Sequence, residues 1–113
     1  MFIIMPLIGS AGAREITTSN TFNFIGDGRY TWTVFIVTDQ QTWNNISCVE
    51  YILHPTFPKP IHNLCGASLK GSPARAFPLS GSGWGEFRIY VRVQFNNGTV
   101  RNLDHWLRLQ DFY

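Results

Sequence analysis

Two short segments of the sequence combine large aromatic side chains with polar and very small residues. The first carries His54, Thr56 and Phe57, with a proline on each side of the Thr56-Phe57 pair, and the second carries Trp84 with a glycine on either side. Aromatic rings in loops are costly to leave in water unless they meet a partner. The glycines leave the backbone N–H groups accessible and let another chain approach closely. These segments are therefore the candidate binding residues.

Polar residues elsewhere do not form a pattern typical of an enzyme or a metal site. Cys48, His54, His62 and Cys65 could supply two thiolates and two imidazoles to zinc, but their spacings do not resemble the usual ligand pairs. We interpret both cysteines as small buried hydrophobic residues, with one disulfide between them as the less favoured alternative. No carboxylate pair, nucleophile–base pair or phosphate-binding loop is evident. The sequence predicts a protein that is not an enzyme and holds no metal or cofactor.

Composition indicates one globular domain. The chain has 113 residues, of which 44% are hydrophobic and 14% charged, a balance that allows a substantial core. The formal net charge is +2 and no basic run is present, which argues against direct nucleic-acid binding. Nothing in the composition indicates an oligomeric state.

The N-terminal residues differ from the rest in composition. The apolar run Met1–Ile8 is shorter than the ~20 residues of a spanning helix, so no membrane span is expected. Small residues ending at Ala13 resemble a cleavage site, but no positive charge precedes the apolar run. We expect residues 1–14 to be an apolar, flexible segment and residues 15–113 to form one domain. A cytoplasmic location is favoured, with a signal peptide at residues 1–13 as the alternative.

Hydrophobic side chains recur at every second position in four stretches, which is the period of half-buried strands. The clearest is residues 86–95, and the others are residues 30–37, 49–53 and 103–109. A more polar stretch, residues 15–25, is expected at a sheet edge.

Turn-forming residues separate these stretches. Asn97-Gly98 follows one strongly patterned stretch and precedes another, and it predicts a type I′ hairpin. Residues 40–45 could form one helical turn, and residues 61–82 are predicted to be a long connection with one short strand. Several short strands without a sustained 3.6-residue period predict an all-β fold, a β-sandwich of two antiparallel sheets.

Three sequence blocks, in the same order along the chain, resemble the YEATS domain family. Trp32 to Ile36 is similar to an early strand of that family. Val49 to Pro60, ending L-H-P-T-F-P-K-P, is similar to its most recognisable motif, and Gly83 to Phe95 begins with the matching G-W-G-E-F. The ending His105-Trp106-Leu107 is closer to the prokaryotic branch than to the eukaryotic chromatin readers. The resemblance implies an immunoglobulin-like β-sandwich.

The resemblance also implies a function, because eukaryotic YEATS domains bind lysine carrying an acetyl, crotonyl or similar acyl group. By motif position, Phe57 and Trp84 would stack on the two faces of the flat amide. The Thr56 hydroxyl would bond to that amide, oriented by His54, and the backbone N–H of Trp84, with that of Gly85, would donate to the acyl carbonyl. Binding of an acylated-lysine peptide or protein is expected to be weak, about micromolar to submillimolar. The candidate ligand-binding residues are His54, Thr56, Phe57, Gly83, Trp84 and Gly85.

Two departures from the family pattern leave an alternative open. Gly28 stands where some members have a further aromatic, for which Tyr30 or Trp43 could substitute, and residues 61–82 are long enough to cover the pocket. The alternative is a prokaryotic signalling or protein-interaction module that has the fold but does not bind acyl-lysine. This alternative would be favoured if Leu69, Phe77 or Leu79 from the long connection filled the space between Phe57 and Trp84.

Overall fold

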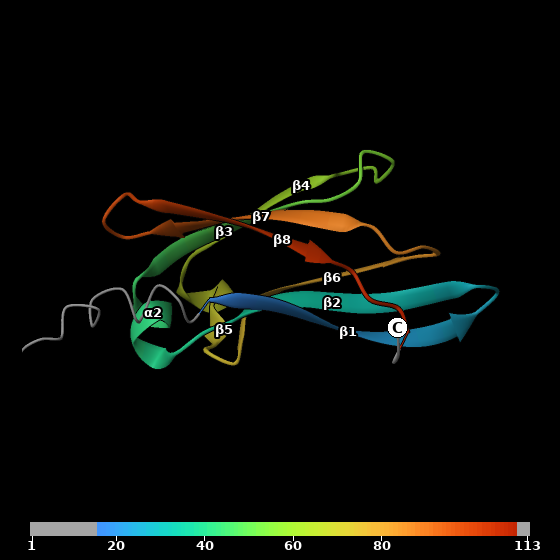
Figure 1. Cartoon of the computed structure of the whole chain (residues 1–113), viewed down its shortest axis with the longest axis horizontal. Coiled ribbons are helices and arrows are strands. Elements are labelled where there is room, and N and C mark those ends of the chain that lie inside the picture. The colour runs from blue at the N-terminus through green and yellow to red at the C-terminus, as the bar shows by residue number, and fades with distance from the viewer. Residues whose placement is uncertain (1–15, 111–113) are drawn as a thin grey trace, which may run out of the picture.

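The computed structural model describes residues 16–110, which form two four-stranded antiparallel sheets packed in two layers (Figure 1). The first sheet has the order β1 (Thr17–Gly26), β2 (Arg29–Val37), β6 (Arg75–Gly83) and β5 (Gly71–Ser72). The second has the order β4 (Ile61–Cys65), β3 (Ile46–Ile52), β7 (Arg88–Phe95) and β8 (Val100–Trp106). The predicted all-β sandwich is confirmed. The expectations for residues 1–14, including the signal peptide, lie outside the described residues.

The core lies between the sheets and follows the two-residue alternation of the sequence. Val34 and Ile36 on β2 face Val49 and Tyr51 on β3, and all four are buried. Tyr51 keeps its polar atom satisfied by donating its hydroxyl to the Phe77 carbonyl at 2.7 Å. Burial raises the pKa of this hydroxyl far above its usual range, so it stays a donor.

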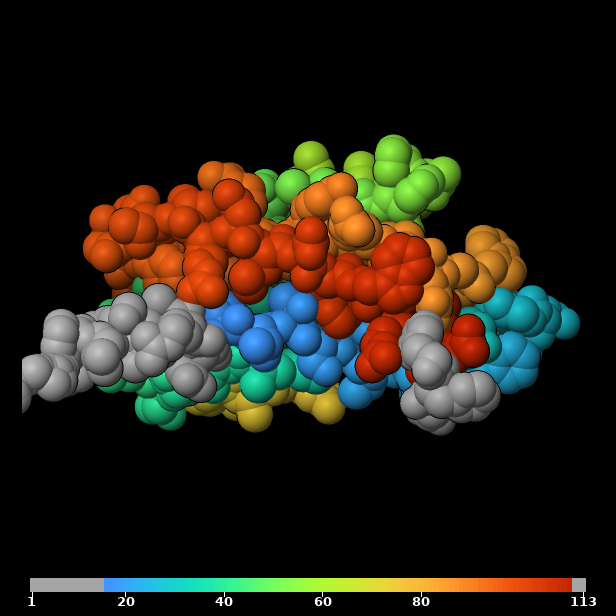
Figure 2. All heavy atoms as spheres, in the orientation of Figure 1, coloured from blue at the N-terminus to red at the C-terminus, as the bar shows by residue number. Residues whose placement is uncertain are grey.

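One long side of the sandwich is closed by side chains that join β1 to β8, whose atoms lie against each other in Figure 2. His105 on β8 contacts the Thr18 hydroxyl through Nδ1 at 2.9 Å and the Asn20 Oδ1 through Nε2 at 2.6 Å. Asn20 continues the link by bonding both backbone groups of Arg108. Burial, and second the positive charge of Arg108, lower the pKa of His105. The stretch expected at a sheet edge is therefore β1, and it is fixed there by polar contacts.

Short helical elements lie between the strands. Helix α2 (Gln40–Asn44) confirms the predicted helical turn, and η1 (Ala67–Leu69) is a single 3₁₀ turn. The Asp39 carboxylate caps α2 by accepting the Thr42 N–H at 2.7 Å. Hydrogen bonds from the Thr42 backbone and side chain hold the pKa of Asp39 below its usual range. Among residues 16–110, no helix is long and apolar enough to cross a membrane.

The β7–β8 hairpin forms as predicted, but the type I′ turn is wrong. Phe95 pairs with Thr99 across a three-residue loop, and within that loop only Gly98 has a positive φ, 89°. The Asn97 side chain explains the difference, because its Oδ1 accepts both the Thr99 N–H at 3.0 Å and the Thr99 hydroxyl at 2.7 Å. These bonds stabilise a longer loop in which a single glycine supplies the left-handed residue.

The predicted long connection with one short strand is also wrong, because residues 61–82 contain β4, η1, β5 and most of β6. The strand β6 is hard to recognise because its sequence alternates serine and glycine. At Gly81 a Cβ would lie 2.6 Å from the Trp32 ring, so the C-terminal half of this strand has no room for a side chain toward the core at that position. The opposite side of this half faces solvent and carries Ser80 and Ser82, so residues 80–83 do not show the hydrophobic period of a strand.

Candidate functional site

Three connections meet at one end of the sandwich, the right-hand end in Figure 1. They are the β3–β4 loop, the β6–β7 connection and the β1–β2 turn. The first two enclose an open pocket of about 350 Å³. The structure brings all six of the candidate residues predicted from the sequence to this pocket: His54, Thr56, Phe57, Gly83, Trp84 and Gly85.

The β3–β4 loop presents a hydroxyl oriented by an imidazole. The loop is closed by hydrogen bonds from the Leu53 N–H to the Pro60 carbonyl, 2.7 Å, and from the Phe57 N–H to the His54 carbonyl, 3.0 Å. His54 Nδ1 lies 2.9 Å from the Thr56 hydroxyl and 3.3 Å from the Thr56 backbone nitrogen. A backbone N–H can only donate, so Nδ1 is the acceptor and the Thr56 hydroxyl also donates to it. The lone pairs of the Thr56 oxygen therefore remain available to accept a bond from a ligand.

The two aromatic rings of the pocket have different support. Phe57 is partly buried, and its ring centre lies 5.2 Å from that of Phe87 and 6.2 Å from that of Trp32. Trp84 is 67% exposed, and its ring is contacted by the Arg29 guanidinium, 4.7 Å from the ring centre. Phe57 is thus a fixed wall, whereas Trp84 offers a large apolar surface to solvent or to a ligand.

The glycines beside Trp84 keep the backbone of the β6–β7 connection accessible. A Cβ on Gly85 would meet no atom within 4 Å, and one on Gly83 would reach only the edge of Phe57 at 4.0 Å. Within residues 16–110, the backbone N–H groups of Trp84 and Gly85 donate to no other group. The connection therefore offers unpaired donors at the pocket, next to an aromatic face.

Sequence reasoning missed further residues of the pocket. Phe87 falls within the alternating stretch of residues 86–95, which predicts only a strand there, yet its ring packs behind Phe57 and lines the pocket with Pro58, Ser82 and Glu86. The Glu86 carboxylate accepts the Trp106 indole N–H at 3.1 Å and the Leu109 N–H at 2.9 Å. The segment after β8 is in this way attached to the rim of the pocket. No local sequence signal shows such a contact between residues 20 or more positions apart.

The possible substitutes for the aromatic missing at Gly28 lie elsewhere. Tyr30 packs edge-on against Phe22 and Phe24, with ring centres 6.2 and 5.2 Å away. Trp43 lies on helix α2 and donates its indole N–H to the Lys70 carbonyl at 3.1 Å. Neither lines the pocket, and a Cβ on Gly28 would lie 3.8 Å from Trp84.

The pocket is not filled from the long connection. Phe77 is fully buried in the core, Leu69 is exposed on η1, and Leu79 packs against the core from β6. Of residues 61–82, only Ser82 lines the pocket. The observation that would have favoured the fold without the binding activity is therefore not met.

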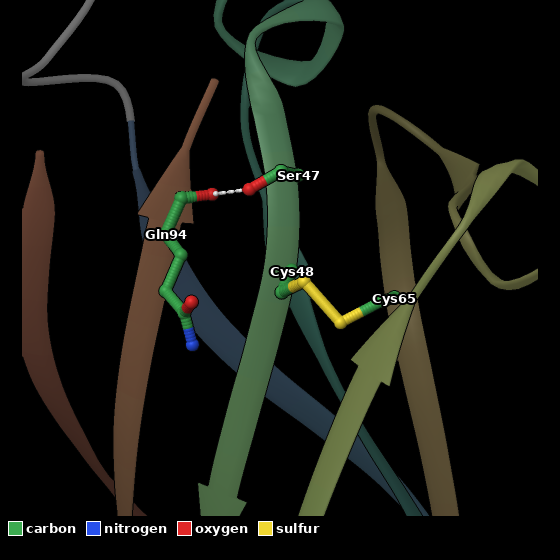
Figure 3. The surroundings of a disulfide bond; sticks show 4 residues. All are labelled: Ser47, Cys48, Cys65 and Gln94. Carbon is green, nitrogen blue, oxygen red and sulfur yellow. Dashed lines mark hydrogen bonds between the residues drawn. A yellow bond between two sulfur atoms is a disulfide. The ribbon is translucent and has the colours of Figure 1, made fainter. Parts of the chain in front are cut away.

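The interpretation of the two cysteines as buried free thiols is wrong, because Cys48 and Cys65 form a disulfide (Figure 3). They lie directly opposite each other on β3 and β4, and Cys65 is exposed. Cys48 precedes buried Val49, so its side chain points away from the core, a signal that could have argued against burial. The bond closes the segment that carries the His54–Phe57 loop, with a sequence separation of 17.

A zinc site at these cysteines is excluded by the same bond, because neither sulfur is a free thiolate. Within residues 16–110, no three histidine, cysteine or acidic side chains lie close enough together to hold a metal ion. What the pocket offers chemically is two aromatic surfaces, an oriented hydroxyl oxygen and two free backbone donors. That set suits recognition of a flat group with both a hydrogen-bond donor and an acceptor.

An open pocket between the end loops of a β-sandwich is the architecture of a loop-based binding domain. The model of the prokaryotic YEATS domain matches residues 30–108, and the chain belongs to this family. The resemblance seen in the motifs is thereby confirmed, including its prokaryotic branch, and so is the immunoglobulin-like sandwich.

Relatives with a curated description come from fungi. The Protein AF-9 homolog of Saccharomyces cerevisiae is 30% identical over 112 residues, which is 95% of this chain and 46% of the relative. The Protein AF-9 homolog of Eremothecium gossypii is 32% identical over 114 residues, 88% of this chain and 51% of the relative. The chain thus spans about half the length of these relatives.

Solved structures with a similar fold include YEATS domains with acylated peptides. The crystal structure of the Yaf9 YEATS domain bound to H3K27ac has a TM-score of 0.67 and 28% identity, over 86% of this chain and 72% of that chain. The Yaf9 YEATS domain recognizing an H3K122suc peptide has a TM-score of 0.66 and 30% identity, over 85% of this chain and 71% of that chain.

Proposed function

We propose that this domain is a non-catalytic module that binds acylated lysine of the acetyl or crotonyl type. The observation that carries the proposal is the convergence of His54, Thr56, Phe57 and Trp84 on one open pocket. The complexes of the Yaf9 domain with acylated peptides support it by similarity.

The chemistry of the pocket explains how it would select an acylated side chain. Acylation removes the lysine charge and replaces it with a flat amide, which costs less to transfer from water. Phe57 and Trp84 would hold that amide between two aromatic faces, each contact contributing about 0.5–1.5 kcal/mol. An unmodified ammonium group would lose hydration on entering, and the Glu86 carboxylate at the pocket is already hydrogen-bonded to Trp106 and Leu109.

Hydrogen bonds would fix the orientation of the amide. The Thr56 oxygen, whose proton is directed to His54, would accept the amide N–H of the acylated lysine. The free N–H groups of Trp84 and Gly85 would donate to the acyl carbonyl. With about 1 kcal/mol net for each such bond, the affinity is expected to be micromolar to submillimolar.

An NMR titration of the isotope-labelled domain tests the proposal. Peptides containing acetyl-lysine, crotonyl-lysine or unmodified lysine are added in parallel. Saturable shifts at the amides of Thr56, Phe57 and Gly83–Gly85 are expected with the acylated peptides alone. Trp84→Ala should weaken binding at least tenfold, because it removes one aromatic face. Tyr90→Ala is the matched control. Tyr90 is also an exposed aromatic residue, with 51% of its surface accessible, but it lies on strand β7, on the outer face of the second sheet.

The absence of shifts at millimolar acylated peptide would refute the proposal. It would favour the alternative, a signalling or protein-interaction module with this fold.

The cytoplasmic location remains a prediction, and the Cys48–Cys65 bond argues against it, because structural disulfides persist mainly in oxidising compartments.

A further inference from the structure

Arg29 is a partly buried cation beside the pocket, and no carboxylate of the described residues neutralises it. Its guanidinium lies 4.7 Å from the centre of the Trp84 ring, and its Nη2 lies 3.4 Å from the Ser82 hydroxyl, a long hydrogen bond. The Nε atom is buried and has no hydrogen-bond partner. Among residues 16–110, no acidic side chain lies within salt-bridge distance of Arg29. A guanidinium has five donors in a fixed fork, and here most of them are unused.

A groove of about 450 Å³ adjoins Arg29 on the outer face of the first sheet. Its two sides are rows of polar side chains that lie opposite one another across β1, β2 and β6. One row is Thr21, Thr33 and Ser80, with the last two hydroxyls 2.7 Å apart. The other row is Asn23, Thr31 and Ser82. Phe22, Trp32 and Gly81 complete the lining, so the groove offers uncharged hydroxyl and amide groups beside apolar surface.

Arg29 lines neither this groove nor the pocket that holds Trp84, but it contacts side chains that do. Ser82 lines both, and Arg29 contacts both Ser82 and Trp84. On β2, Arg29 is two residues before Thr31, so the two side chains leave the same face of the sheet. A ligand held against Trp84 and extending onto the outer face would therefore meet the guanidinium first and the hydroxyl rows next.

We propose that Arg29 and the groove beside it form a subsite for a carboxylate carried by the same ligand that places its acyl-lysine in the pocket. This inference rests on the proposed function and adds a charge preference to it. A carboxylate would take the unused guanidinium donors in a two-pronged bond and pair a cation that is now partly desolvated. The stacking on Trp84 holds the guanidinium plane in place, which reduces the entropy lost on binding.

The carboxylate could come from an acidic residue next to the acylated lysine or from the end of the acyl chain itself. Three peptides with otherwise identical sequences separate these sources. The first has acetyl-lysine with alanine neighbours, the second has acetyl-lysine with aspartate neighbours, and the third has succinyl-lysine with alanine neighbours. Affinities are measured by calorimetry or NMR at low and at physiological salt.

The subsite predicts that one of the two carboxylate peptides binds about five- to tenfold more tightly than the neutral acetyl peptide. Arg29→Gln should remove that advantage and leave the neutral peptide within about twofold, while Arg29→Lys should keep part of it. Arg75→Gln is the matched control, because Arg75 also stacks on an aromatic ring, that of Phe35 at 4.8 Å, on the same sheet face. It removes the same charge far from the pocket and should leave the preference unchanged.

The outcomes separate this inference from the proposed function. Equal binding of all three peptides by the wild-type domain, or an advantage that survives Arg29→Gln, overturns the carboxylate subsite while the acyl pocket stands. An equal loss in Arg75→Gln overturns it as well, since the effect is then general electrostatics. No binding of any acylated peptide refutes the acyl pocket itself. Thermal unfolding of each variant confirms that an observed loss is not a folding defect.

Discussion

Two histidine–threonine pairs in this domain have the same hydrogen-bond length and very different surroundings. His54 Nδ1 lies 2.9 Å from the Thr56 hydroxyl at the pocket, and His105 Nδ1 lies 2.9 Å from the Thr18 hydroxyl between β1 and β8. His54 is exposed, and within the described part of the chain its Nε2 bonds to nothing. His105 is only 8% exposed, and its Nε2 is held by Asn20.

The difference shows how one pair of residue types can serve cohesion or recognition. Between β1 and β8 every polar atom of the imidazole has a partner inside the fold, so the pair joins two sheets and offers nothing to a ligand. At the pocket the pair is left incomplete, because the Thr56 oxygen still has lone pairs facing outward. The number of satisfied atoms, and not the residue types, separates the two roles.

The largest expected effect on stability comes from removing the disulfide. This bond closes the segment that contains the His54–Thr56 pair and does not include the His105–Thr18 pair. Replacing Cys48 and Cys65 by serine should lower the free energy of unfolding by about 3 kcal/mol, because the unfolded chain loses a constraint on a loop of this length. Urea unfolding measures this change. NMR signals of the His54 ring should broaden or shift in the variant, while those of the His105 ring should stay unchanged.

Reduction of the wild-type protein is the control for these serine substitutions. It should produce the same destabilisation, and the double variant should be insensitive to reductant. A loss below about 1 kcal/mol in both experiments would mean that the β3–β4 ladder alone holds the loop.

The second prediction compares the two pairs directly by replacing the histidine of each pair with alanine. His105→Ala should lower the free energy of unfolding by about 2 kcal/mol, because it removes the hydrogen bonds to the part-buried Thr18 and Asn20 side chains and opens a cavity. His54→Ala should change stability by less than about 0.5 kcal/mol, because the ring is exposed. It should instead weaken binding of an acetyl-lysine peptide several-fold, because the Thr56 hydroxyl loses its orientation.

Unfolding curves and peptide titrations on both variants decide whether the two pairs differ in this way. Equal loss of stability in the two variants would contradict the assignment of separate roles. So would a binding defect in His105→Ala at temperatures where that variant is fully folded.

Sequence alone could predict the fold because the strands with a buried face carry a clear two-residue period. Val34 and Ile36, or Ile89, Val91 and Val93, show this pattern, and their burial confirms it. The C-terminal half of strand β6 could not be predicted, because its core side is occupied by Gly81 against the Trp32 ring and its outer side by serines. What defines this part of β6 as a strand is its pairing with β2, which its own residues do not reveal.

The pocket could be located from sequence because its residues come in two short motifs. The contact of Arg29 with Trp84 could not be predicted from these motifs, because it depends on how the β1–β2 turn meets the β6–β7 connection. The disulfide is of the same kind, because pairing depends on the register of Cys48 opposite Cys65. Features made by two distant segments are those that sequence reasoning missed.

The smallest expected effect is the change of stability with pH, which follows from the burial of His105. Burial lowers the pKa of His105 in the folded protein, while in the unfolded chain it returns to about 6.5. Between these two values the unfolded state binds more protons, so stability rises with pH. His105 is neutral in both states above about pH 7, so the stability is fully present there and is lost as the pH falls toward the folded-state pKa.

Urea unfolding between pH 5 and pH 7.5 should therefore show a loss of stability on acidification in the wild-type protein. The carboxyl of Asp39, whose pKa is held below its usual range, titrates under this window and does not contribute to the slope. His105→Gln should flatten this slope, because glutamine cannot take up a proton. A slope that persists in His105→Gln would show that another group titrates on unfolding, and the contrast between a saturated buried pair and an open exposed one would then lose its electrostatic support.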